Sequence, residues 1–244
     1  MAEKIYMIPV NDAFDAQSEC PVCSMYQKLE DDAVDFMIGS GASYMVDDIR
    51  LATDEIGFCK PHMKILAVQK NRLGLALILK THLDKQKKNA ENVYKKGIRP
   101  RSFLQKQEDA PIVTWAKKAS SSCYICDRIN VMFPRYIDTI FYLYKKDPAF
   151  RDKYAHCKGF CQEHLGVLLE KAQKEFGKQE LQAFTDLTVK LYTDNLQRLS
   201  DDLDWFVMKF DYLHRNDPWK ESKDAIERAA VKTNGVMPPA EKTS

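Results

Sequence analysis

The strongest constraint in this sequence is a pair of Cys/His motifs that occurs twice. The motif Cys20-x-x-Cys23 is followed by Gly57-Phe-Cys-x-x-His62, and downstream Cys123-x-x-Cys126 is followed by Gly159-Phe-Cys-x-x-His164. The second copy begins 103 positions after the first, and nearly the same length of chain separates the two motifs in each copy. We therefore interpret the motifs as one structural unit present twice, each copy with three Cys and one His.

The spacing inside each motif is typical of metal ligands. Two Cys separated by two residues can wrap one ion, and Cys-x-x-His at a helix start puts a thiolate and an imidazole on the same face, one turn apart. Zinc accepts four such ligands in a tetrahedron. The sequence therefore predicts two zinc ions per chain, with the ligands Cys20, Cys23, Cys59, His62, Cys123, Cys126, Cys161 and His164. The alternative cofactor is a [4Fe–4S] cluster at each site, because Cys thiolates also hold these clusters.

The sequence leaves open which motifs share an ion. In the simplest assignment each copy binds its own ion, so that the first dithiol joins Cys59 and His62, and the second joins Cys161 and His164. In the alternative, the copies exchange partners and each dithiol meets the Cys-x-x-His motif of the other copy. In either case a site filled by four protein ligands keeps no position for water or substrate, which is typical of structural sites.

Composition and periodicity predict an all-α fold. The 244 residues include only 9 Gly and 10 Pro, and apolar residues recur at helical intervals. We expect two pseudo-repeated helical halves, each with a three-Cys-one-His metal site, plus a long C-terminal helix. The expected domains are a first half (1–98), a linker (99–119), a second half (120–215) and a C-terminal short helix with a tail (216–244).

Three segments carry more specific expectations. Residues 1–18 lack periodicity and contain Pro9 and Asn11, which predicts a loop. A single long helix is expected from Pro61 to about Lys88, because proline suits a first helical turn. The clearest amphipathic stripe predicts another long helix with the inward residues Leu181, Phe184, Leu187, Leu191, Leu199, Leu203, Phe206, Phe210 and Leu213.

Charge and targeting signals narrow the possible partners. The net charge of +2, from 37 basic and 35 acidic residues, does not favour nucleic acid. We interpret the basic run from Lys85 to Lys106 as a charged linker. No secretory signal and no membrane-spanning stretch is recognisable, so we expect a cytoplasmic protein. In that reducing compartment the seven Cys favour metal binding over disulfides.

The sequence gives no catalytic residues. It contains no nucleophile–base pair, phosphate loop or organic-cofactor fingerprint that we recognise, so whether the chain is an enzyme stays open. The seventh cysteine, Cys157, is either an ordinary thiol or a reactive or spare ligand. The first hypothesis is a metal-binding protein that acts as a binding or adaptor module for an unknown protein partner or a second copy. The rival hypothesis is an iron–sulfur or metal-dependent redox enzyme.

Further motifs extend the pattern beyond the ligands. They are Asp47-Asp48-Ile-Arg50, Leu73-Gly-Leu-Ala-Leu77 and Trp219-x-x-Ser222-x-x-Ala225-Ile226-Glu227-Arg228. Together with the Cys/His motifs, they resemble an uncharacterised bacterial family that is known as a domain of unknown function and is common in anaerobes. The resemblance covers nearly the whole chain and implies that the Cys/His residues bind metal. It implies no activity, substrate or partner.

Overall fold

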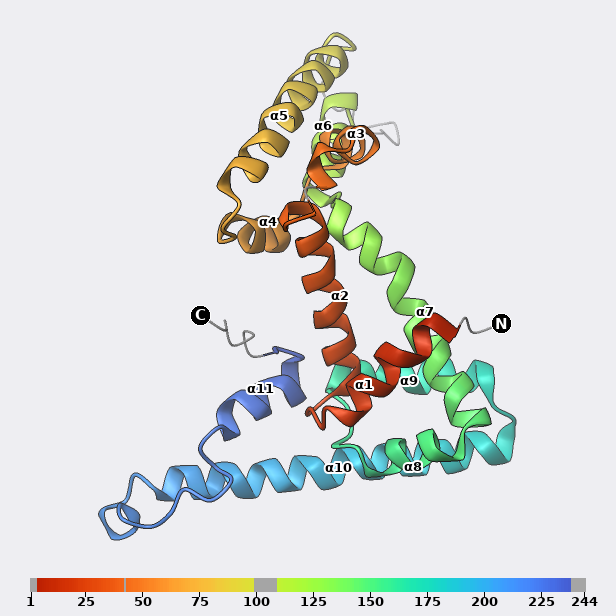
Figure 1. The fold of residues 1–244 in the computed structure, drawn as a ribbon, viewed down its shortest axis with the longest axis vertical. Coiled ribbons are helices and arrows are strands. Elements are labelled where there is room, and N and C mark those ends of the chain that lie inside the picture. The colour runs from red at the N-terminus through yellow and green to blue at the C-terminus, as the bar shows by residue number, and fades with distance from the viewer. Residues whose placement is uncertain (1–3, 42, 99–108, 238–244) are drawn as a thin grey trace, which may run out of the picture. The chain divides into compact units, whose positions relative to one another are not determined.

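The computed structural model describes residues 4–41, 43–98 and 109–237, and within these ranges the secondary structure is helical throughout, without a strand. This confirms the all-α prediction. The α-helices are α1 (Met7–Asp15), α2 (Pro21–Ile38), α3 (Asp47–Ile56), α4 (Lys60–Ala67), α5 (Arg72–Tyr94), α6 (Pro111–Ser121), α7 (Tyr124–Lys146), α8 (Pro148–His156), α9 (Gln162–Glu175), α10 (Lys178–Met208) and α11 (Ala225–Asn234). Three short 3-10 helices are η1 (Lys4–Tyr6), η2 (Ser43–Met45) and η3 (Tyr212–His214) (Figure 1). None of the described helices is both long enough and apolar enough to cross a membrane.

The single helix expected from Pro61 to Lys88 is wrong, because the chain breaks between α4 and α5. Asn71 starts α5: its Oδ1 accepts a hydrogen bond from the Gly74 backbone N–H at 2.8 Å, and its Nδ2 donates to the Ile38 carbonyl at 3.0 Å. An asparagine before a helix supplies an acceptor that the first turn lacks. Asn71 was therefore a sequence signal for a new helix start.

Two expected irregular segments are also partly helical. The predicted loop at residues 1–18 contains α1, because Pro9 falls in the first helical turn, where its missing N–H is harmless. Buried Val10 and Phe14 hold this helix in place. The predicted linker 99–119 includes most of α6, which begins at Pro111, whereas residues 99–108 lie outside the described part. Of the basic run, Lys85 lies on α5 and pairs with Glu55 at 2.9 Å.

The chain forms two compact units. We call the described residues up to Lys28 and from Phe133 onward the terminal unit, and Leu29–Met132 the middle unit. The boundaries between them fall inside α2 and α7. These units group the chain differently from the halves defined by sequence, so the halves and their pseudo-repeat stay a prediction.

Aromatic side chains form the core of the terminal unit, where α8, α9 and α11 pack on α10 (Figure 1). Phe14 contacts Phe150 with ring centroids 4.9 Å apart, and it also contacts Phe160, the residue before Cys161. At the centre, fully buried Tyr154 shares a 2.9 Å hydrogen bond with the hydroxyl of buried Thr188 on α10. Each fully buried ring contributes about 1.5–3 kcal/mol, so this core fixes the loop that carries Cys161.

In the middle unit, α3 packs on α5, and α5 also contacts α4 and α6. The buried residues of α3, α4 and α5 are Thr53 on α3, His62 and Leu66 on α4, and Gly74, Leu75 and Ile78 on α5. His82 of α5 reaches the end of α3, where its Nδ1 lies 2.8 Å from the Asp54 carbonyl oxygen. This packing holds the loop between α3 and α4, which contains Gly57 and Cys59.

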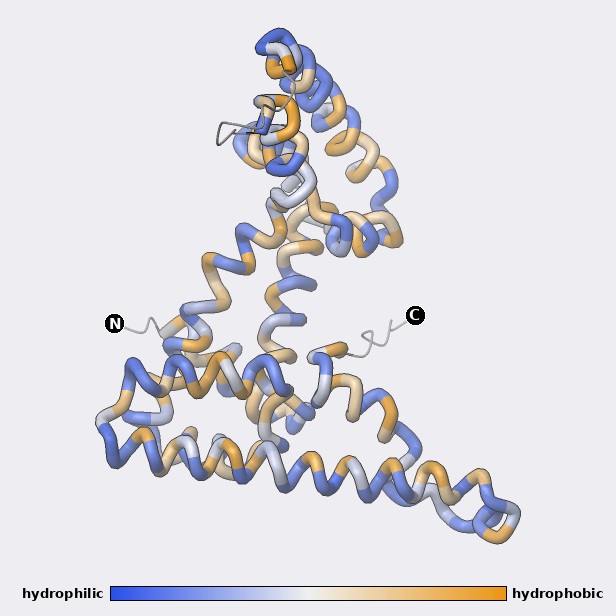
Figure 2. Tube along the Cα trace, turned by 180° about the vertical axis from the view of Figure 1, so that it is seen from behind, coloured by the Kyte–Doolittle hydropathy of each residue, from blue (hydrophilic) through white to orange (hydrophobic). Residues whose placement is uncertain are grey.

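The long helix predicted from the amphipathic stripe is α10, but it ends before the stripe does. Phe184 and Leu199 are buried, whereas Phe210 and Leu213 follow the end of the helix and are 76% and 67% exposed. Figure 2 shows hydrophobic residues alternating with hydrophilic ones along α10 and continuing into the turn beyond it. The last two positions were therefore wrongly predicted as inward residues.

The backbone conformation of the loop before Cys161 requires a glycine at position 159. Its φ is +74°, and a Cβ there would lie 2.9 Å from the Leu191 carbonyl oxygen of α10. Gly159→Ala should destabilise the protein by about 2 kcal/mol or more, from backbone strain and this clash. Exposed Gly166 in α9 has open space around its Cα, so Gly166→Ala should stabilise by about 0.5–1 kcal/mol. Urea unfolding of both variants would measure this difference, and equal effects would contradict the assignment.

Candidate metal centres

The structure gathers the eight predicted ligands into two groups, each of three Cys and one His, whose ligand atoms all lie within 4.8 Å of one another. The terminal-unit cluster is Cys20, Cys23, Cys161 and His164, and the middle-unit cluster is Cys59, His62, Cys123 and Cys126. Each dithiol therefore meets the Cys-x-x-His motif of the other copy. The simplest assignment, with each ion bound within one copy, is wrong, and the exchanged pairing is correct.

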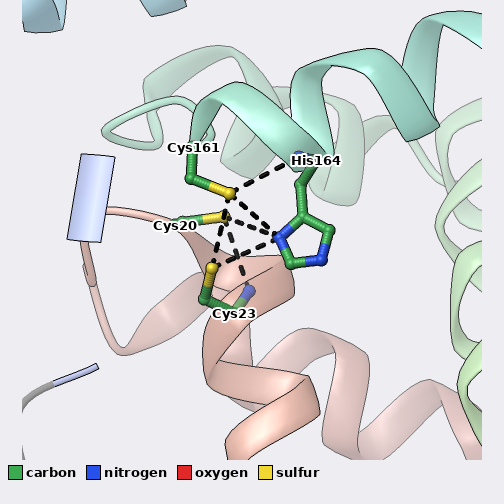
Figure 3. A group of neighbouring side chains, drawn as sticks. All are labelled: Cys20, Cys23, Cys161 and His164. Carbon is green, nitrogen blue, oxygen red and sulfur yellow. Dashed lines mark hydrogen bonds between the residues drawn. The ribbon is translucent and has the colours of Figure 1, made fainter. Parts of the chain in front are cut away.

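In the terminal-unit cluster three sulfurs surround one ring nitrogen (Figure 3). The Nδ1 atom of His164 lies 3.5 Å from the Cys20 sulfur and 3.2 Å from both the Cys23 and the Cys161 sulfur. The sulfurs of Cys23 and Cys161 are 3.5 Å apart. All four residues are buried.

The middle-unit cluster repeats this arrangement. The Nδ1 atom of His62 lies 3.2 Å from the Cys59 sulfur, 3.1 Å from that of Cys123 and 3.3 Å from that of Cys126. The sulfurs of Cys59 and Cys126 are 3.7 Å apart. Cys123 and His62 are buried, whereas Cys59 and Cys126 are partly exposed.

These distances fit the shell of one small ion. With Zn–S bonds of about 2.3 Å and Zn–N bonds of about 2.0–2.1 Å, neighbouring ligand atoms in a tetrahedron lie about 3.5–3.8 Å apart. The sulfur–sulfur distances of 3.5 and 3.7 Å match this range, and the shorter nitrogen–sulfur distances need only a small outward movement. Soft thiolates with one imidazole suit zinc. Each cluster can therefore hold one such ion.

Every ligand lies at the start of a helix. The first Cys of each motif immediately precedes a helix, and the second ligand is the third residue of that helix: α2 and α9 meet in one cluster, α7 and α4 in the other. Backbone N–H groups of the first turn donate to the leading sulfur, from Cys23 to Cys20, from Cys126 to Cys123 and from His164 to Cys161, at 3.4–3.5 Å. Unpaired amides and the positive end of the helix dipole stabilise thiolate anions at these positions.

The Gly-Phe before each Cys-x-x-His motif has a structural reason. Gly57 and Gly159 have φ angles of +70° and +74°, which side chains on other residues disfavour. Each also approaches a neighbour closely: a Cβ at Gly57 would lie 2.6 Å from the His82 ring. The two cysteines that follow have nearly the same extended backbone, with ψ angles of 165° and 167°. The turn thus aims the sulfur into the cluster in the same way in both motifs.

In the middle unit, direct hydrogen bonds join the two motifs of the cluster. The Tyr124 backbone N–H donates to the Gly57 carbonyl at 2.9 Å, and the Ser122 hydroxyl donates to the Ile56 carbonyl at 2.6 Å. The start of α7 is thereby fixed beside the loop that carries Cys59.

In the terminal unit, Pro21 stands where Tyr124 stands in the other copy, and proline has no N–H to donate. Lys232 of α11 makes the connection instead. Its fully buried ammonium donates to the Glu19 and Lys158 carbonyls at 2.5 Å each and lies 3.5 Å from the Glu19 carboxylate. One side chain therefore joins the residue before Cys20 to the loop before Cys161.

Neighbouring groups orient and cover the ligands. In the middle unit the Glu30 carboxylate lies 3.1 Å from Nε2 of His62, which leaves Nδ1 to face the sulfurs. In the terminal unit the Phe133 ring covers His164 at a centroid distance of 5.8 Å. Gly235, the left-handed C-cap of α11, lies so close that a Cβ there would be 3.6 Å from the Cys23 sulfur. Sequence reasoning found none of these contacts, because the Cys/His spacing carries no trace of them.

The pKa values of the ligands indicate that each cluster favours a positive charge. Burial opposes protonation of His62, but hydrogen bonds that its ring donates to Cys123 and Glu30 raise its pKa to about 10. The pKa of His164 also rises to about 10, again against burial, through Cys161 and Cys20. Burial raises the pKa of Cys123, yet the contact with His62 lowers it overall to about 6. A metal ion among the sulfurs would supply this positive charge in place of a proton.

Cys157 belongs to neither ligand group. It is buried, and burial raises the pKa of its thiol to about 11, so the thiolate form is scarce at neutral pH. These properties are those of an ordinary core cysteine rather than a reactive one.

The role of Lys232 gives a stability prediction. Lys232→Met keeps the side-chain length but leaves the Glu19 and Lys158 carbonyls without this donor, whereas the Glu19 carboxylate keeps its 2.5 Å hydrogen bond from Arg198. Two buried carbonyls left without a donor should lower the free energy of unfolding by about 3 kcal/mol. Exposed Lys223 is the control, and Lys223→Met should change the free energy of unfolding by less than about 0.5 kcal/mol. Urea unfolding would measure both, and a neutral Lys232→Met would contradict the bridging role.

Comparison with known proteins adds one match. The model of a family described as a family of unknown function, DUF6062, matches residues 1–240. No curated protein and no solved structure matches the chain.

Proposed function

The chain belongs to this family of unknown function, and we propose that it is a zinc protein that acts as a binding or adaptor module for a partner protein. One zinc ion binds in each cluster and cross-links the starts of two helices. The observation that carries this proposal is the completeness of both clusters: four ligands surround each centre and leave no position for a substrate. Cytoplasm is the proposed location, because a reducing compartment keeps thiolates available.

Cross-linked helix starts are what these clusters provide. In the terminal unit the ion ties α2 to α9, and in the middle unit it ties α7 to α4. The protein residues supply three negative charges and a neutral ring, and the helix N-termini offset the remaining negative charge. Binding energy of a structural ion is folding energy, so removal of the metal should loosen both pairs of helices.

The distances favour a single ion over an iron–sulfur cluster. A [4Fe–4S] cluster distributes its ligands over separate iron atoms, so the ligand atoms lie farther apart than in the shell of one ion. Sulfur–sulfur distances of 3.5 and 3.7 Å leave no room for a cluster between them. The redox-enzyme alternative therefore loses its main support, although a single iron ion has the same geometry and is an outcome of the test.

Elemental analysis tests the metal. Protein purified without oxygen should contain two zinc ions per chain and no iron. The exchanged pairing predicts different outcomes for two double variants. Cys20→Ser with Cys161→Ser removes two ligands of one cluster and should leave one zinc ion. Cys20→Ser with Cys59→Ser damages both clusters and should leave none.

Circular dichroism of each double variant is the control for folding. If the purified protein contained stoichiometric iron and absorbed visible light, the ion in the proposal would be iron and not zinc. Loss of both ions from the first double variant, with the helix content retained, would contradict the independence of the two clusters.

An exposed apolar turn supports the binding role. The last turn of α10 and the residues after it display Val207, Phe210, Tyr212 and Leu213, which are 67–83% exposed. Large apolar side chains exposed close together in the chain are typical of interaction sites. We call these four residues the apolar turn.

The apolar turn is held in shape from inside. Lys209 is only 7% exposed, and its ammonium donates to the carbonyls of His214, Arg215 and Asp217 at 2.5–3.0 Å. Trp205 adds a hydrogen bond from its ring N–H to the Pro218 carbonyl at 3.1 Å. A surface that is rigid before binding loses less entropy when a partner docks.

The charges near the apolar turn favour a protein partner. Between residues 204 and 223, four basic residues are balanced by four acidic ones: Lys209, Arg215, Lys220 and Lys223 against Asp204, Asp211, Asp217 and Glu221. A polyanion would need a net positive surface. An apolar pocket on a partner protein, or on a second copy of the chain, fits this surface better.

Matched substitutions test the binding role. Phe210→Ser with Leu213→Ser should abolish the association of proteins that co-purify reproducibly with the wild type after cross-linking. The control is Leu73→Ser with Leu83→Ser on α5, which are 70% and 64% exposed and lie outside the apolar turn. Sedimentation of the purified protein separates a foreign partner from self-association. Equal retention of partners by both double variants would contradict the role of the turn.

A further inference from the structure

We propose that the middle-unit cluster is an oxidation site at which hydroperoxides convert Cys59 and Cys126 into a disulfide and release the metal, while the terminal-unit cluster resists. This inference rests on the proposed function, in which zinc occupies both clusters. It assigns to the two centres different roles: one holds the fold, and the other responds to oxidants.

The two clusters form a matched pair. Their ligand sets are identical, and in each a dithiol cysteine and the cysteine of a Cys-x-x-His motif lie close together: Cys23 and Cys161 at 3.5 Å, Cys59 and Cys126 at 3.7 Å. The difference is access. All four residues of the terminal-unit cluster are buried, whereas Cys59 and Cys126 both reach solvent. Oxidation of a thiolate depends on its charge and its exposure, and the exposure differs between these pairs.

The enclosure of the terminal-unit cluster has identifiable parts. The C-cap of α11 at Gly235 lies against the Cys23 and Cys161 sulfurs, and Lys232 of the same helix fixes the two loops that lead to the ligands. Phe133 covers the ring of His164. The middle-unit cluster has hydrogen bonds between its loops, but on the partly exposed side the residues next to the ligands, Lys60 and Asp127, are exposed.

The reaction balances with a hydroperoxide as oxidant. One of the two exposed thiolates attacks a peroxide oxygen, so that an S–O bond forms, the O–O bond breaks, and the leaving oxygen takes a proton to give water or an alcohol. The second thiolate attacks the resulting sulfenic acid: the S–S bond forms, the S–O bond breaks, and hydroxide leaves as water after protonation. Two thiolates lose two electrons in total, and the peroxide gains them.

Geometry and ligand count explain why the metal leaves. The two sulfurs must approach from 3.7 Å to about 2.05 Å, a movement within reach of side-chain rotation. A disulfide no longer offers thiolates, so the ion keeps only Cys123 and His62. Two ligands of four do not retain zinc against a chelator. The hydrogen bond from Tyr124 to Gly57 persists, so the loops stay adjacent and reduction can restore the site.

The test starts from protein with two measured zinc ions per chain, treated with hydrogen peroxide in the presence of a chromogenic zinc chelator. One zinc ion should be released at least about tenfold faster than the other. Peptide mapping after alkylation of free thiols should find a Cys59–Cys126 disulfide, with Cys20, Cys23 and Cys161 still free. Dithiothreitol and zinc should restore the original content.

A variant that retains all eight ligands tests whether access to the cluster controls the rate of metal release. Phe133→Ala retains all eight ligands but uncovers one side of the terminal-unit cluster at His164, and it should speed the release of the second ion relative to the wild type. Release of both ions at the same rate in the wild type, release of neither, or a disulfide between other cysteines would overturn the inference. Fewer than two zinc ions before oxidation would instead overturn the proposed function on which it rests.

Discussion

Three sulfurs and one imidazole that converge within a few ångströms need a positive charge among them, and the rest of the structure is arranged around this requirement. Contacts with the cysteine sulfurs raise the pKa of both histidines to about 10 against the effect of burial, so each cluster favours a positive charge. Four helices begin at the two clusters, so their N-termini already supply part of that charge. In the proposed function a metal ion would supply the rest and would turn a costly burial of thiolates into a cross-link.

In both clusters the two loops that carry the ligands are held together, but by different groups. In the middle unit, backbone and hydroxyl groups join the loops directly, and two sulfurs remain accessible. In the terminal unit a proline removes the donor, and Lys232 of α11 takes its place while the end of that helix covers the sulfurs. The helix that compensates for the missing hydrogen bond therefore also encloses the centre, and the difference in access follows from it.

Buried lysines have a common role in this protein. Lys232 and Lys209 are both nearly inaccessible, and each donates to backbone carbonyls of segments outside the α-helices. Carbonyls in turns lack partners within a helix, and a buried ammonium satisfies several at once. Lys232 uses this to hold the loops of a cluster, and Lys209 uses it to present an apolar turn, so the same interaction builds a closed site and an open surface.

The residues that converge and the local geometry of each motif could be predicted from the amino-acid sequence. Spacings of two residues between ligands fix them at the start of a helix, and Gly57 and Gly159 set the turn before it, because these are short-range constraints. Each motif, however, supplies only half of a coordination shell. Contacts between residues far apart in the chain decide which halves meet and how exposed they are. The same contacts decide the part that α11 plays. Tertiary packing alone decided these features, since no local spacing records them.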